Sequence, residues 1–216
     1  MTSIDTQATR TTTSSCILYA DTELLASCSS GDLKTVKELI KNGALHSVKD
    51  SFGNTPIHLA TTGRHHDVMH YLLQNHAEVD AQNIEKSTSL YSAVENNDLD
   101  AVIILCAYNA CCNLVCKDQK SPFFLACELY HLSIIEHLIN CGANLNQGQL
   151  GKTFPIHLLA KHNAYAILES LLELNKIDLF PPQNPQEFNC LHLATQFEYI
   201  DLLKLFLRFK PDLGQG

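Results

Sequence analysis

Histidine and cysteine are the residue types in this sequence with the most evident chemistry. The chain contains eleven histidines and nine cysteines, and both types bind metals and take part in nucleophilic catalysis. His58, His157 and His192 each precede a leucine within the same local pattern. Residues that recur once in each copy of a repeated pattern are spread along the chain and do not gather at one site. We therefore predict a structural role for these three histidines.

The densest group of cysteines is Cys106, Cys111, Cys112 and Cys116. Zinc sites usually show one close cysteine pair and a second pair some distance further on, and this spacing fits that pattern only loosely. Cys106 also stands where other parts of the chain place Ile or Leu, so it is expected to pack as a small hydrophobic residue. We predict that these cysteines bind no metal.

Two other patterns suggest chemistry and are rejected. His66 and His70 lie one helical turn apart, but the sequence shows no third ligand beside them. The segment 148–153 resembles a phosphate-binding loop but lacks the four-residue gap between its glycines. Since no nucleophile elbow or other catalytic signature is present, we predict no enzyme activity, no catalytic residue, no metal and no cofactor.

Composition narrows the class of protein. The 216 residues carry a net charge of −8, which disfavours binding to nucleic acid, and no stretch is apolar enough for a membrane span. An odd number of irregularly spaced cysteines without a secretory signal predicts free thiols in a reducing, cytoplasmic compartment. Residues 1–16, rich in Thr and Ser, are expected to form a disordered arm.

A period of 33 residues dominates the rest of the chain. Three series of residues keep this spacing. They are Leu39, Leu72, Leu105, Leu138 and Leu171; Ala44, Ala77, Ala110 and Ala143; and Val36, Met69, Val102, Ile135 and Leu168. Three independent series at one period indicate a repeated supersecondary unit.

The residues between these series repeat a recognisable motif. Residues 53–60 read Gly-Asn-Thr-Pro-Ile-His-Leu-Ala, and similar turns recur at 155–158 and 191–194. Residues 141–146 read Cys-Gly-Ala-Asn-Leu-Asn. Together these motifs resemble the ankyrin-repeat family, and the resemblance extends over roughly residues 18–213. In that family, the position of Cys112 is a buried valine.

The resemblance implies an all-α fold, an ankyrin-repeat α-solenoid of about six helix–turn–helix units linked by hairpin-like loops. We place the repeat domain at 17–213, with units at 17–49, 50–82, 83–115, 116–148, 149–181 and 182–213. The last unit contains an insertion near the turn-rich residues 180–185.

Local chemistry agrees with such units. The hydroxyl of Thr55 is expected to cap a helix that begins at Pro56, and Asp67 stands at the start of the next helix. His76 and Lys86 occupy positions where the family usually has glycine, and we expect His76 to adopt a left-handed backbone conformation at modest cost.

The resemblance implies that the chain binds another protein, with the hairpin tips and inner helices lining a concave face. The side chains predicted to bind a partner are Phe52, Ile84, Glu95, Asn96, Glu128, Leu129, Lys161, His162, Phe188, Gln196 and Phe197. Two narrower hypotheses stay open: an inhibitory protein that masks a transcription factor, and a bacterial or viral effector delivered into a host cell to act on host proteins.

The last helix is unusually apolar, with Leu202, Leu203, Leu205, Phe206, Leu207 and Phe209 close together. A terminal repeat normally has a polar outer face, because no further repeat covers it. We therefore expect self-association or contact with a further domain at the C-terminal repeat.

Overall fold

The computed structural model describes residues 20–149, 153–179 and 190–209. The predicted arm at 1–16, the turn-rich stretch 180–185 and Phe188 lie outside these residues. Within the described part, the regular structure is helical apart from an isolated antiparallel bridge between Gln149 and Thr153. The expectation of an all-α fold is thus confirmed.

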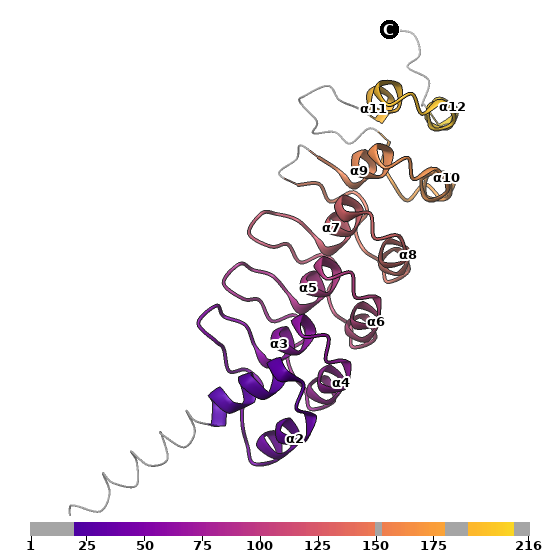
Figure 1. The fold of residues 1–216 in the computed structure, drawn as a ribbon. Helices are drawn as coiled ribbons and strands as arrows, with labels where there is room; N and C mark the ends of the chain where they lie inside the picture. The colour runs from indigo at the N-terminus through magenta and orange to yellow at the C-terminus, as the bar shows by residue number, and fades with distance from the viewer. Residues whose placement is uncertain (1–19, 150–152, 180–189, 210–216) are drawn as a thin grey trace, which may run out of the picture. The chain divides into compact units, whose positions relative to one another are not determined.

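The first compact unit of the chain ends at Cys111. Helical residues 20–30 precede α2 (Leu33–Lys41), and two helix pairs follow: α3 (Pro56–Thr62) with α4 (His66–Gln74), and α5 (Ser89–Glu95) with α6 (Leu99–Ala107). Within each pair the helices pack together, α3 also packs on α5, and α4 packs on both α2 and α6. Figure 1 shows the hairpin loops projecting beside the first helix of each pair.

The second compact unit begins at Cys112 and repeats this arrangement. Its helix pairs are α7 (Pro122–Leu129) with α8 (Leu132–Asn140), α9 (Pro155–Lys161) with α10 (Tyr165–Glu173), and α11 (Cys190–Gln196) with α12 (Ile200–Arg208). The first helices pack in the order α7, α9 and α11, and α10 packs on α12.

The helices begin where polar side chains satisfy free backbone amides. Thr88, Ser121 and Asp98 accept hydrogen bonds from the first turns of α5, α7 and α6. Thr55 and His58 form a capping box at the start of α3, and the Thr55 hydroxyl also lies 2.8 Å from His58 Nδ1. The imidazole of His58 takes part in this box because it accepts from the Thr55 amide.

Left-handed backbone conformations recur at the helix ends and hairpin tips. His76 has a φ angle of 65°, which confirms the expectation, and Lys86 has a φ of 56°. Gln119 stands 33 residues after Lys86 and has a φ of 60°. These side chains adopt the strained conformation because the packing of the flanking helices fixes the path of the loop.

The residues that keep the 33-residue period form the core. Val36, Met69, Val102, Ile135 and Leu168 are all fully buried, as are Leu72, Leu105 and Leu138. Leu39, at the start of the leucine series, is only half-buried. The residues that recur at this period therefore form the surfaces through which helix pairs pack on their neighbours.

Three of the six apolar residues predicted to crowd the C-terminal helix are buried in the core. Leu202, Leu205 and Phe206 on α12 are buried, whereas Leu207 is exposed. Ile200, at the start of the same helix, is also exposed. Self-association at this end stays a prediction.

The core series can be tested with a matched pair of substitutions on α6. Leu105 is fully buried and Ile103, two residues earlier, is 41% exposed. We expect Leu105→Ala to lower the free energy of unfolding by about 2–5 kcal/mol, because it leaves a cavity between helix pairs. Ile103→Ala should cost well under half as much. Urea denaturation measures both, and equal losses would show that the series does not mark the core.

Candidate functional site

His58 joins two successive repeats through hydrogen bonds. Its Nδ1 accepts from the Thr55 amide at 3.2 Å, so Nδ1 carries no proton and Nε2 donates to the Ser87 carbonyl at 3.0 Å. Burial lowers the pKa of His58 and so favours the neutral ring. His157 accepts from the Phe154 amide in the same way. The structural role is confirmed for His58, whereas His192 is exposed on α11.

His66 has acidic neighbours that the sequence did not reveal. Ligand atoms of His66, Asp98 and Asp100 all lie within 4.8 Å of one another, so a third potential metal ligand does exist. However, His66 Nε2 already lies 2.8 Å from Asp98 Oδ2, and Asp98 caps α6 by accepting from the Ala101 amide. His70 instead packs edge-on against Tyr108. These bonds join α4 to α6, so the cluster has a structural role.

The described cysteines differ sharply in accessibility. Cys112 and Cys116 are buried, which agrees with packing, whereas Cys106 and Cys111 are half-buried. Burial raises the pKa of Cys28 to about 12 and that of Cys190 to about 12, so both are unreactive thiols. Cys141, which follows α8, is exposed.

In the first compact unit, the candidate side chains lie at hairpin tips and at the end of α5. Phe52 and Ile84 are 69% and 55% exposed on successive hairpins, and the Ile84 amide donates to the Phe52 carbonyl at 3.0 Å. This bond places two apolar side chains side by side at the tips. Glu95 is the last residue of α5, and the carbonyl of Asn96 accepts from the Arg64 guanidinium.

In the second compact unit, the candidates occupy the ends of the first helices. Glu128, Lys161 and Gln196 fall at equivalent places in the three repeats. Each is followed directly by a second candidate: Leu129, His162 and Phe197. The unit's remaining candidate, Phe188, lies outside the described residues. These paired positions form one row along α7, α9 and α11, which we call the first-helix face.

Hydrogen bonds between repeats fix the backbone of the first-helix face. His162 Nε2 lies 3.3 Å from the Glu128 carbonyl, and the Tyr199 hydroxyl donates to the Lys161 carbonyl at 3.3 Å. The Glu128 carboxylate pairs with Lys120 Nζ at 2.6 Å. The face is thus held in place while its side chains remain accessible.

Two tyrosines complete this face and were missed in the sequence. Tyr130 stacks on His162 with ring centroids 4.7 Å apart, and Tyr199 stacks on Phe197 at 5.6 Å. Tyrosine is enriched in protein interfaces, since its ring packs and its hydroxyl bonds. The sequence could have indicated both tyrosines, because each follows the end of a first helix by one to three residues.

Comparisons with known proteins agree with the repeated architecture. The family model described as ankyrin repeats (3 copies) matches residues 23–118 and 123–215. Within the described residues, no helix is both long and apolar enough to cross a lipid bilayer.

Several curated proteins contain similar segments. The chain is 29% identical over 188 residues to neurogenic locus notch homolog protein 1 of Xenopus laevis, which covers 79% of this chain and 7% of that protein. It is 22% identical over 186 residues to transient receptor potential cation channel subfamily A member 1 of Homo sapiens, covering 82% of this chain and 17% of that protein. With alpha-latroinsectotoxin-Lt1a of Latrodectus tredecimguttatus the identity is 27% over 96 residues, 44% of this chain and 7% of the toxin. The chain thus spans only a small part of these relatives.

The buried histidine predicts a pH dependence of stability. The folded state lowers the pKa of His58, so below the unfolded pKa of about 6.5 the unfolded chain binds more protons, and stability falls as pH falls. We expect His58→Gln to be less stable at neutral pH but to lose less stability between about pH 7 and about pH 5.5. Urea denaturation at each pH measures this.

An exposed histidine serves as the control for this prediction. His76→Asn should keep the full acid loss, because His76 is exposed and asparagine tolerates its left-handed backbone. If the His58→Gln protein lost as much stability on acidification as the unmodified protein, the buried neutral imidazole would not be its cause.

Thiol labelling tests the cysteine assignments. In the native protein we expect Cys141 to react quickly with a disulfide reagent, whereas Cys28, Cys127 and Cys190 react only after unfolding, because burial raises the pKa of each. Cys141→Ser should therefore remove one fast-reacting thiol. Denatured protein should titrate nine thiols without stoichiometric zinc, matching the nine cysteines of the sequence. Zinc that disappears in Cys111→Ser or Cys116→Ser would contradict the packing interpretation.

Proposed function

Because this chain belongs to the ankyrin-repeat family, whose members generally serve as protein-interaction modules without enzyme activity, we propose that it binds a protein partner through its concave face. In the second compact unit, the surface concerned is the first-helix face. In the first, it comprises Phe52, Ile84, Glu95 and Asn96.

The observation that carries this proposal is the change from burial to exposure at the ends of α7 and α9. In α7, every residue from Pro122 to Cys127 is buried, and exposure begins at Glu128 and Leu129. The end of α9 repeats this change at Lys161. Packing therefore fixes the body of the helix, while the residues at its end are free to meet another molecule.

The chemistry of the first-helix face suits a protein surface. Phe197 and Leu129 are 40% and 43% exposed and offer apolar anchors, with stacked aromatic rings beside them. Lys161 and Glu128 supply opposite charges, which can select a partner and its orientation. Since bonds between repeats already order the backbone, binding needs little further loss of conformational entropy.

The test compares the first-helix face with the opposite side of the same repeats. Once a partner is identified, Phe197→Ala should weaken its binding by about thirtyfold, since a buried aromatic anchor contributes about 2 kcal/mol or more. Glu128→Lys should also weaken it, because it places a cation beside Lys120. Titration calorimetry of folded variants gives both values.

Lys204→Glu is the matched control, because Lys204 is highly exposed on α12 and makes only a surface ion pair with Asp201. Binding that survives Phe197→Ala and Glu128→Lys but is lost in Lys204→Glu would place the partner on the second helices and refute the proposal.

A further inference from the structure

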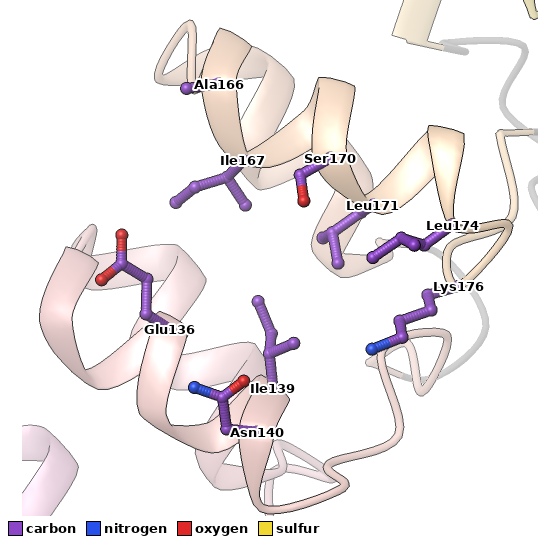
Figure 2. Close-up of a pocket in the computed structure, with 9 residues that line it drawn as sticks. All are labelled: Glu136, Ile139, Asn140, Ala166, Ile167, Ser170, Leu171, Leu174 and Lys176. Atoms are coloured by element: carbon purple, nitrogen blue, oxygen red, sulfur yellow. The ribbon is translucent and has the colours of Figure 1, made fainter.

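A groove lies between α8 and α10, on helices that the proposed first-helix face does not use. Its volume is about 360 Å³. Figure 2 shows side chains from both helices pointing into the space between them. By contrast, α4 packs on α6 and α10 packs on α12.

A small side chain lines the groove where other second helices carry larger ones. Ser170 is the sixth residue of α10, and the sixth residues of α6 and α12 are Ile104 and Leu205. Both of those side chains are buried, whereas Ser170 is exposed and lines the groove. At this position α4 and α8 have Tyr71 and His137, so Ser170 is smaller than its counterparts on all four helices.

The walls of the groove are apolar and accessible. Ile139 from α8 and Ile167 from α10 are half-buried, and Leu174 at the end of α10 is 60% exposed. An exposed cluster of this kind favours association with an apolar surface. The volume lies at the lower end of the range for ligand pockets, which begins at about 300 Å³. It is therefore large enough for a few aliphatic side chains.

Opposite charges mark the two ends of the groove. Figure 2 places Glu136 at one end and Lys176 at the other. Neither side chain forms an ion pair with another residue in the part of the chain that the structure describes. On the far side of α10, by contrast, Glu169 and Glu173 both pair with Arg208.

From the small side chain of Ser170, the apolar walls and the unpaired charges, we propose that this groove binds a short segment of a partner protein. The segment inserts aliphatic side chains between α8 and α10, places a basic residue beside Glu136 and places an acidic residue beside Lys176. A helical segment suits the site, since residues one turn apart project from the same face. This surface is distinct from the first-helix face, so the two can be occupied independently.

Three fluorescein-labelled peptides test the proposal by fluorescence polarisation. Each has two leucines one helical turn apart; the flanking residues are one Arg and one Glu in the first peptide, two Arg in the second and two Glu in the third. The protein should prefer the mixed peptide by about tenfold, which corresponds to about 1.4 kcal/mol. Glu136→Lys should shift the preference to the acidic peptide, and Lys176→Glu to the basic one.

Ser170→Leu separates loss of the groove from loss of the fold. It introduces the residue found at this position in α12, so it should maintain or raise stability. It should weaken the binding of every peptide by at least about tenfold. Phe197→Ala and Lys204→Glu should leave peptide binding unchanged.

Several results would overturn the proposal. They are absence of binding to the unmodified protein, equal binding by the Ser170→Leu protein, and preferences that ignore the two charge reversals. Self-association that disappears in Ser170→Leu, seen by light scattering, would instead assign the groove to a second copy of this chain.

Discussion

The structure depends on the packing of each helix pair against its neighbours. The helices of these pairs are seven to nine residues long, too short to be stable alone in water. Each therefore persists because adjacent pairs cover its apolar side. Leu105 and Met69 are fully buried at such surfaces, and His58 adds a bond from one repeat to the carbonyl of the next. This one constraint explains the period of the core, the buried imidazole and the fixed loop paths.

The same constraint made much of the fold predictable. Positions between helix pairs must be apolar, so the period survives even where the turn motif is lost, as at Ser89 and Phe124. The left-handed conformation of His76 was predictable because the family usually has glycine at that turn. The pairing of Thr55 with His58 was not foreseen, since a ring three residues away competes with the helix amides for the hydroxyl. The contact of His66 with Asp98 joins residues 32 apart, and only the assembled repeats bring them together.

Surface chemistry was less predictable because packing does not constrain it. The repeat register indicates which positions, such as Glu128 and Lys161, end the first helices. It does not show that Tyr130 and Tyr199 stack beside them, since that depends on rotamers and on the residue in the next repeat. The groove was missed for another reason. Ser170 differs from the equivalent residues of α6 and α12, and the insertion before α11 shifts the alignment with α12 by two residues.

The two surfaces relate differently to stability. At the first-helix face, Phe197 and Lys161 are not required by the core, so they can serve a partner at little cost to folding. At the groove, Ser170 is exposed, whereas Ile104 and Leu205 are buried at the same position of α6 and α12. The repeats on either side of the groove are joined by the contact of α7 with α9. A ligand that fills the groove would add apolar contact there, so its binding and the stability of this unit are thermodynamically linked.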